Sequence, residues 1–573
     1  MHTGIPTGTV PFVDRSAGES PAPGQYDFVV VSNRLAVDRV VDDEGNATWQ
    51  RSPGGLVTAL APIMAREEGA WIGWNGAPTA SSAMDDDVNG TEDVDVEEDV
   101  ESAQEHWEPF DHDGMHLVPV PLSAQDIEEY YEGFSNATLW PLYHDVIASP
   151  EFHRQWWDTY QQVNSRFARA AAATASEGAT VWVQDYQLQL VPRMLRRLRP
   201  DLRIGYFHHI PFAPVEIFAQ LPWRRPVLEG LLGADLIGFQ RTSDVSNFQR
   251  AVGRIVGGTF RSGALQVPGH DGGSRTVRAE AFPISIDTDT ITTLAKDPKI
   301  QARARQIRED LGNPQTILLG VDRLDYTKGI RHRIKAYAEL LEDRRLTVDQ
   351  ACLVQVASPS RENVESYREL RDEIELSVGR VNGTFDTMGH TAIRYLHHSY
   401  PVEEMVALYL AADVMLVTAL RDGMNLVAKE YVAARGGWGG VLVLSEFAGA
   451  ADQLRKALLV NPHDIDGLKD AIMEAIEMNP KESRKRMKAM HRQVLTNDVN
   501  KWSREFLDRL GGRSRRTIGR EEGSGSTAFM DTDDDRSRRD YEHAERVEEA
   551  ARVEEAARVE EAYSPQAQDG GGR

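Results

Sequence analysis

The sequence has almost no cysteine and no long apolar run. Of its 573 residues only Cys352 is a cysteine, and a single thiol cannot form an intramolecular disulfide. No stretch of 18 apolar residues is present to cross a membrane, and the N-terminus lacks the basic and then apolar pattern of a secretion signal. These absences predict a soluble protein of a reducing, cytoplasmic compartment.

Positive charge is also in short supply. The chain has 89 acidic and 64 basic residues, which gives a net charge of −25. This balance argues against a nucleic-acid partner, because such a partner requires a basic face. Acidic residues are dense in residues 79–113, which we interpret as a solvated surface insertion. The alternative interpretation of that segment is a docking site for a basic partner.

The C-terminal segment, residues 511–573, reads as a charged low-complexity tail. It repeats Ala-Arg-Val-Glu-Glu-Ala, so that Arg546, Arg552 and Arg558 lie six residues apart. On a helix this period places the valines of the repeat on three faces about 120° apart, and no apolar seam forms. A coiled coil requires a sustained spacing of about 3.5 residues. We therefore expect a disordered tail or a solvated single helix.

Apolar, β-branched segments alternate with helical patterns in both halves of the chain. Alternating βα units predict doubly wound α/β sheets, and a chain of this length is too long for one core. We expect a flexible N-terminus at 1–24, domains at 25–285 and 286–510, and then the tail. The expected strands lie at 28–32, 180–183, 204–207 and 236–239 in the first half, and at 316–321, 353–357, 414–418 and 441–444 in the second.

Residues 421–430 join an expected strand to an expected helix through a polar loop. They read Arg-Asp-Gly-Met-Asn-Leu-Val-Ala-Lys-Glu. Such a junction exposes backbone N–H groups and the positive end of a helix at the carboxyl edge of a sheet, where anionic nucleotides bind. Asp422 and Asn425 can cap the helix, and Glu430 can accept two ribose hydroxyls. An ordinary capped helix with a solvated Glu explains the same residues.

A second loop, residues 322–329, follows another buried-strand pattern and holds two cations. Arg323 offers a planar fork of donors and Lys328 a compact point charge. This combination suits a diphosphate whose negative charge grows as it leaves. The alternative is a surface ion pair of Arg323 with Asp322 or Asp325.

About ten short motifs, in order, resemble the trehalose-6-phosphate synthase family of retaining glucosyltransferases. The resemblance covers residues 25–505. The motifs are Val31-Ser-Asn-Arg34, Ser52-Pro-Gly-Gly55, Tyr130-Tyr131, Phe134-Ser-Asn-Ala-Thr-Leu-Trp-Pro141, Trp182-Val-Gln-Asp-Tyr186, His209-Ile-Pro-Phe212, Asp322-Arg-Leu-Asp-Tyr-Thr-Lys-Gly329, Ser360-Arg361, Arg421 to Glu430 and Ser445-Glu-Phe-Ala-Gly-Ala450.

The resemblance implies a GT-B fold, in which two Rossmann-like domains face each other across a cleft. It also implies that Arg323 and Lys328 stabilise the leaving diphosphate, that Asp422 holds the glucose hydroxyls and that His209 binds the transferred glucosyl unit. The donor-binding residues that it implies are Gly54, Gly55, Arg323, Lys328, Tyr400, Leu426, Val427, Ala428, Lys429 and Glu430.

The same resemblance implies the acceptor site. Two arginines from different domains can grip a phosphate dianion, and a carboxylate can accept from sugar hydroxyls. The implied acceptor residues are Arg34, Tyr131, Asp185 and Arg361, with Trp140 and Trp74 as walls of the pocket. Taken singly, Tyr131 also reads as a core aromatic, Asp185 as a helix cap, Arg34 as a surface charge and His209 as a structural residue.

A metal site is not expected. His208 precedes His209 on one strand, and adjacent strand residues point to opposite faces, so the pair cannot readily chelate one ion. We expect no cofactor, because two cations already face the diphosphate.

The implied reaction is glucosyl transfer from a nucleoside-diphosphate glucose, UDP-glucose in the first instance, to glucose 6-phosphate. Two alternatives remain, namely transfer to another phosphorylated acceptor such as glycerol 3-phosphate, and a non-catalytic sugar-phosphate sensor. The sequence leaves open the donor base (uracil, adenine or guanine) and the oligomeric state, a homo-oligomer included.

Overall fold

The computed structural model describes residues 24–41, 47–52, 57, 60, 63–64, 68–79, 108–268, 273–361 and 364–512. Residues 80–107 of the predicted acidic insertion and 513–573 of the predicted tail lie outside the described residues. So do Gly54 and Gly55, which were expected at the donor. The description therefore concerns the compact unit that ends at Gly512.

The first half of the chain is built on a nine-stranded sheet. The strands pair in parallel except at the two edges, where β10 with β11 and β5 with β6 are antiparallel. The central strands follow the order of a doubly wound sheet, with the reversal between β1 and β7. In spatial order the strands are β10 (Ala264–Pro268), β11 (Ser274–Ala281), β9 (Leu236–Phe239), β8 (Arg203–Phe207), β7 (Ala175–Gln184), β1 (Tyr26–Arg34), β4 (Ala70–Trp74), β6 (Met115–Pro119) and β5 (Phe110–His112).

The second half is built on a six-stranded sheet whose paired strands are all parallel. Its strand order is that of a Rossmann sheet, with the reversal between β12 and β15. In spatial order the strands are β14 (Ile393–Leu396), β13 (Ala351–Ser358), β12 (Thr316–Arg323), β15 (Val414–Val417), β16 (Val441–Ser445) and β17 (Leu458–Val460).

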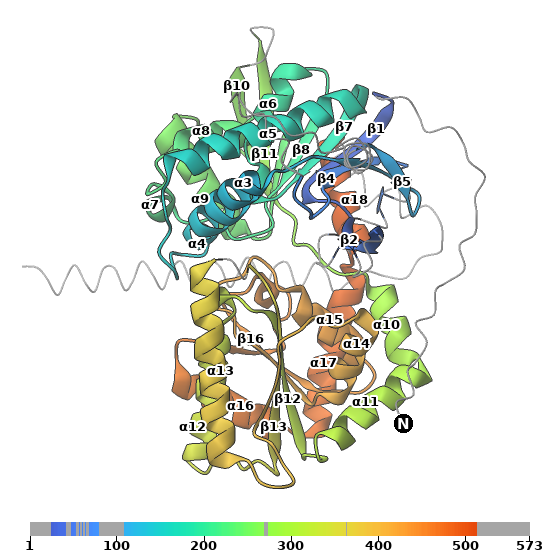
Figure 1. The fold of residues 1–573 in the computed structure, drawn as a ribbon, viewed down its shortest axis with the longest axis vertical. Helices are drawn as coiled ribbons and strands as arrows, with labels where there is room; N and C mark the ends of the chain where they lie inside the picture. Colours follow the sequence, from blue (N-terminus) through green and yellow to red (C-terminus); the bar gives the residue numbers. More distant parts are fainter. Residues whose placement is uncertain are drawn as a thin grey trace, which may run out of the picture. The chain divides into compact units, whose positions relative to one another are not determined.

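Strands of the second sheet are apolar on both faces because helices cover both faces (Figure 1). Leu318 joins the core on one side of β12, and its neighbours Ile317 and Leu319 join the core on the other. The first side holds α12 (Ile330–Glu342), α13 (Glu365–Phe385) and α16 (Ile465–Glu477), and the second holds α10 (Thr288–Lys296), α11 (Pro298–Asp310), α14 (Val402–Ala411), α15 (Leu426–Arg435) and α17 (Pro480–Thr496).

The first sheet is accompanied by helices and by a long π-helical segment, η1 (Ile127–Leu139), which carries Tyr130 and Tyr131. A short hairpin of β2 (Val37–Val41) and β3 (Ala47–Arg51) follows β1. The helices of this half are α3 (Ala124–Asp126), α4 (Trp140–Tyr143), α5 (Arg154–Thr174), α6 (Val191–Leu198), α7 (Val215–Phe218), α8 (Arg224–Leu231) and α9 (Thr242–Ala251), followed by the π-helical turn η3 (Val252–Val256).

Helix α18 (Val499–Leu510) belongs by sequence to the predicted second domain, 286–510, yet its apolar side chains pack on the first sheet. The ring of Phe506 stacks on that of Trp182 at 4.7 Å, and the indole Nε1 of Trp502 donates to the carbonyl of Phe282 at 3.1 Å. A Cβ at Gly205 or at Gly238 would lie 2.8 Å from the Phe506 ring, so these glycines make room for the helix. The chain therefore crosses between its two halves twice.

The predicted fold class is confirmed. Seven of the eight expected strands lie within observed ones, and the eighth, 414–418, extends one residue beyond β15, which ends at Val417. The expected helix after residue 425 is α15. In the part of the chain that the structure describes, no helix is long and apolar enough to span a membrane. The hairpin, the edge strands and the π-helical segment have no counterpart among the predictions.

We expect Gly320→Ala to lower the free energy of unfolding by about 3 kcal/mol, because it crowds a filled site. A Cβ at Gly320, in β12, would lie 2.0 Å from Nη1 of the buried Arg333 and 2.5 Å from Oε1 of Gln355. Urea denaturation of both proteins measures the loss. The matched control is Gly379→Ala in α13, where a Cβ meets nothing within 4 Å and helix propensity predicts a gain of up to about 1 kcal/mol. Equal stability of Gly320→Ala and the wild type would contradict this account of the core.

Candidate active site

The predicted site residues lie at the carboxyl ends of central strands of both sheets. In the first sheet β1 ends at Arg34, and Asp185 follows β7 directly. In the second sheet β12 ends at Arg323, and Arg421 lies four residues beyond the last residue of β15. These ends flank the two places where the strand order reverses, which is where doubly wound sheets bind ligands.

Loops 322–329 and 421–430 of the second half meet through one ion pair, between Lys328 and Asp422. Nζ of Lys328 donates to Oδ2 of Asp422 at 2.7 Å, and Nδ2 of Asn425 donates to the same oxygen at 3.2 Å. Burial raises the pKa of Asp422, but Lys328 more than offsets it, and the pKa lies below its usual value. Of the two expected caps, only Asn425 caps α15, since its Oδ1 accepts from the Ala428 N–H at 3.0 Å.

Arg323 is not paired with Asp322, which was one alternative for this loop. Oδ2 of Asp322 instead accepts from Nη1 of the buried Arg333 at 2.7 Å. The side chain of Arg323 is exposed, and its guanidinium carbon lies 5.5 Å from the ring centroid of Trp140 in the first half. Arg323 therefore faces Trp140, which the family resemblance implies as a wall of the acceptor pocket.

Arg361, from the second half, contacts two aromatic side chains of the first. Its guanidinium carbon lies 3.9 Å from the ring centroid of Trp140, and Nη2 donates to the Tyr186 hydroxyl at 3.1 Å. The Arg361 backbone has a φ of 51°, which an L residue rarely adopts and which strains the chain. The surrounding contacts therefore impose this conformation.

Arg34 and two aromatic side chains form a second group in the first half. The guanidinium carbon of Arg34 lies 4.6 Å from the ring centroid of Trp74, and Nη2 pairs with Oδ1 of Asp38 at 2.8 Å. The rings of Trp74 and Tyr131 lie 5.9 Å apart. Tyr131 is only partly buried, so its side chain is not simply part of the core.

Asp185, directly after β7, and His209, two residues beyond β8, are linked by a hydrogen bond. Oδ1 of Asp185 accepts from the backbone N–H of Tyr186 at 2.9 Å and from that of His209 at 3.1 Å. Burial raises the Asp185 pKa to about 7, although the two N–H groups and nearby arginines oppose the rise. Burial lowers the His209 pKa to about 3, so the ring is neutral at pH 7; its Nε2 lies 2.9 Å from Oε1 of Gln184.

His208 faces a different neighbour from His209. Its Nδ1 lies 3.0 Å from the Tyr206 hydroxyl. Among the residues that the structure describes, no three His, Cys, Asp or Glu side chains gather as a metal ion would require.

The expected donor residues on and before α15 differ in how much of their side chain is available. Oε2 of Glu430 accepts from the Tyr409 hydroxyl at 2.7 Å. Lys429 is buried, and its Nζ donates to the Ile284 carbonyl at 2.6 Å, which leaves its backbone for a ligand. Tyr400 lies before α14 with its ring 4.2 Å from that of His398. Leu426 and Val427 are half-buried, and Ala428 is buried.

Three polar residues that our sequence reasoning assigned no role lie among the site residues. Tyr186 contacts Arg361, Gln184 contacts His209, and Asp325 lies 3.5 Å from Arg361. Tyr186, Gln184 and Asp325 all fall inside motifs that were recognised. The signal was therefore present, but the partner of each residue comes from elsewhere in the chain.

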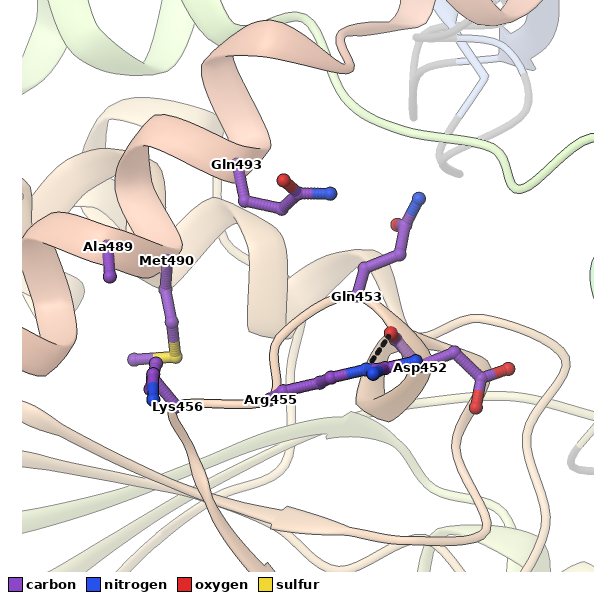
Figure 2. Close-up of a pocket in the computed structure, with 7 residues that line it drawn as sticks. All are labelled: Asp452, Gln453, Arg455, Lys456, Ala489, Met490 and Gln493. Atoms are coloured by element: carbon purple, nitrogen blue, oxygen red, sulfur yellow. Dashed lines mark hydrogen bonds between the residues drawn. The ribbon is translucent and has the colours of Figure 1, made fainter. Parts of the chain in front are cut away.

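A surface cavity of about 390 Å³ lies between α17 and the loop before β17, away from the residues above. Figure 2 shows its lining, with Met490 and Gln493 on the helix and Arg455 on the loop, where Nε donates to the Asp452 carbonyl at 3.2 Å. The lining includes none of the expected site residues.

Two doubly wound sheets of this kind are the architecture of the GT-B class of glycosyltransferases. The model of glycosyltransferase family 20 matches residues 26–511. The trehalose-6-phosphate synthase of Mycolicibacterium gilvum is 55% identical over 502 residues, which cover 87% of this chain and 96% of that protein. The chain belongs to glycosyltransferase family 20.

Solved structures agree with this assignment. The chain is similar to an α,α-trehalose-phosphate synthase (UDP-forming) from Burkholderia xenovorans in complex with glucose-6-phosphate, with 34% identity, a TM-score of 0.74, and coverage of 85% of this chain and 100% of that one. It is also similar to a structure described as trehalose-6-phosphate from E. coli bound with UDP-2-fluoro glucose, with 33% identity, a TM-score of 0.72, and coverage of 84% and 98%.

Proposed function

We propose that this protein transfers glucose from a nucleoside-diphosphate glucose, UDP-glucose first among donors, to glucose 6-phosphate and so forms α,α-trehalose 6-phosphate. The observation that carries the proposal is the position of Arg361 and Arg323, from the second half, against Trp140 of the first. This position supports a diphosphate clamp next to an acceptor pocket. Relatives named trehalose-6-phosphate synthase support it, as do solved relatives bound to glucose-6-phosphate and to UDP-2-fluoro glucose.

The donor is proposed to bind at the carboxyl edge of the second sheet. Arg323 and Lys328 face the diphosphate and stabilise the charge that grows on it as the glycosidic bond breaks. The ion pair with Lys328 holds Asp422 in place, and the carboxylate accepts from the glucose hydroxyls. The N-terminal turn of α15, capped by Asn425, faces the phosphates with its backbone N–H groups, and Glu430 accepts from the ribose.

The acceptor is proposed to bind between Arg34 and Arg361, which hold its phosphate together with the Tyr131 hydroxyl. Trp74 and Trp140 wall the pocket, and each lies against one of the two arginines.

Asp185, which follows β7, and His209, which follows β8, are proposed to contact the two sugars. Ionised Asp185 accepts from acceptor hydroxyls. Neutral His209 is held by Gln184 and bonds the transferred glucosyl unit.

The reaction retains the anomeric configuration when the acceptor hydroxyl attacks on the face from which the diphosphate departs. The C–O bond to the diphosphate breaks, the new C–O bond forms, and the leaving phosphate takes the proton of the acceptor hydroxyl. The protein then positions the two substrates and stabilises the charge on the leaving diphosphate. The reaction requires no pair of carboxylates across the scissile bond.

The domains are proposed at 25–285 and 286–510, with α18 returning to the first sheet. We also propose a reducing, cytoplasmic location. The support is that Cys352, the one cysteine of the sequence, is a free and buried thiol in β13 and forms no disulfide.

The function is tested by measuring nucleotide release with UDP-, ADP- and GDP-glucose against glucose 6-phosphate, glycerol 3-phosphate and water. We expect release to require glucose 6-phosphate and to be fastest with UDP-glucose. Release with glycerol 3-phosphate but not with glucose 6-phosphate would identify glycerol 3-phosphate as the acceptor. No release with any donor would favour a non-catalytic sugar-phosphate sensor.

We expect Arg323→Ala to lower kcat more than tenfold, because the departing diphosphate loses a positioned cation. Folding should be unchanged, since the side chain is exposed. Steady-state kinetics and circular dichroism measure the two effects. The control is Arg331→Ala, an exposed arginine of the neighbouring helix α12 that pairs with Glu373. Wild-type turnover in Arg323→Ala would remove this residue from the mechanism.

We expect kcat/KM for glucose 6-phosphate to fall as the pH is lowered through about 7, because Asp185 then gains a proton and no longer accepts from sugar hydroxyls. Asp185→Asn should lack this step and give a lower, flatter profile. The acceptor phosphate also titrates, at about pH 6. It does so with the wild type and with Asp185→Asn alike, so the ratio of their kcat/KM values at each pH reports on Asp185. A ratio independent of pH would contradict the prediction.

Protonation of Asp185 does not lower kcat/KM by unfolding the protein, because it stabilises the folded state. The folded pKa of Asp185 lies above its unfolded value of about 3.9. The ionised carboxylate therefore costs stability at and above pH 7, and that cost is relieved as the pH falls.

A further inference from the structure

Among the residues that the structure describes, the guanidinium of Arg361 faces one carboxylate, that of Asp325. Nη1 donates to the Tyr367 hydroxyl and lies 3.5 Å from Oδ2 of Asp325, and Nη2 donates to the Tyr186 hydroxyl. The Arg361 side chain is 5% exposed and that of Asp325 is fully buried. A buried guanidinium requires such a counter-charge, because an unpaired charge in this environment is costly.

The carboxylate of Asp325 divides its two oxygens between two tasks. Oδ1 accepts from the backbone N–H of Thr327 at 2.9 Å and from its hydroxyl at 2.8 Å. Oδ2 accepts from the Tyr367 hydroxyl at 3.2 Å and faces Arg361. Burial would raise the Asp325 pKa, but Arg361, Lys328 and Arg323 hold it at about 2, so the group is ionised at pH 7.

The Oδ1 contacts fix the short turn that carries Lys328. Asp325 caps the 3₁₀ turn η4 (Tyr326–Lys328), and its own carbonyl accepts from the Lys328 N–H at 3.1 Å. At the end of this turn Nζ of Lys328 reaches Asp422. Displacement of the Asp325 carboxylate would therefore move the turn on one side and Arg361 on the other.

We propose that Asp325 is a positioning residue that sets the acceptor-phosphate arginine, Arg361, and the donor-diphosphate lysine, Lys328, in one fixed relation. The inference rests on the proposed function for the roles of those two cations. One oxygen serves the donor side and the other serves the acceptor side. Asp325 itself touches neither substrate.

The geometry gives three variants with different expected effects. Tyr367→Phe removes a hydroxyl that bonds both Arg361 and Asp325, and should raise the acceptor KM at least threefold while the donor KM stays within twofold. Thr327→Val removes the hydroxyl on the Oδ1 side, and should raise the donor KM at least threefold while the acceptor KM stays within twofold. Asp325→Asn, whose amide opposes the guanidinium, should raise the acceptor KM at least tenfold and the donor KM at least threefold.

The matched control is Asp386→Asn. Asp386 also accepts from a backbone N–H, that of Ala392, and from a threonine hydroxyl, that of Thr391, but it lies beyond α13. A purely structural loss lowers the active fraction and hence kcat, and it leaves both KM values unchanged. We expect that pattern for Asp386→Asn, and the same pattern in Asp325→Asn would overturn the proposal.

The experiment is steady-state kinetics with UDP-glucose and glucose 6-phosphate, joined to calorimetric binding of UDP and of glucose 6-phosphate to the same proteins. Absence of turnover in the wild type would defeat the proposed function, and the binding constants would then decide the role of Asp325 separately. If Asp325→Asn does not fold, Tyr367→Phe and Thr327→Val decide it. Opposite selectivity in those two variants supports the proposal, and equal effects on both substrates contradict it.

Discussion

The buried guanidinium of Arg333 holds together the strand ends on which the second half of the site depends. Its Nη1 donates to Asp322, at the end of β12, and to Gln355 in β13, each at 2.7 Å. Its Nε donates to the hydroxyl of Thr418, directly after β15, at 3.2 Å. One side chain therefore ties the three strands that carry Arg323 at the end of β12, and Arg361 and Asp422 in the loops after β13 and β15. Because the guanidinium is fully buried, these bonds form in a low dielectric and tolerate little displacement.

Three cations of the candidate site have acidic partners within the protein. Lys328 pairs with Asp422, Arg361 faces Asp325, and Arg34 pairs with Asp38. Such pairs keep side chains of like charge close together without a bound anion, so less ordering remains when a phosphate arrives. They also reduce the net charge at the strand ends. An excess of acid over the whole chain is thus compatible with a site for anions.

Much of the fold could be predicted from the sequence, because a buried parallel strand leaves a continuous apolar run that is visible without a structure. The segment from Thr316 to Val321 is such a run, and β12 contains it. Edge strands such as β14 and β17 are short and carry no such signal. The individual contacts of the site were out of reach because their partners are distant in sequence, as with Arg361 and Tyr186, which lie 175 residues apart. Asp422 reads as a helix cap beside Asn425 until the position of Lys328 is known.

The return of α18 to the first sheet limits how the two halves can move. The polypeptide passes between them near Ile284 and again near Val499, and the two passages are bonded to each other where the Val499 N–H donates to the Ile286 carbonyl at 3.0 Å. A single connection would allow rotation about many axes. Two adjacent connections that are bonded to each other leave few such axes. The least strained rotation is about an axis that passes through the bond between Val499 and Ile286. The side chains that meet between the halves, such as Arg361 and Trp140, are therefore held by two neighbouring connections rather than by one.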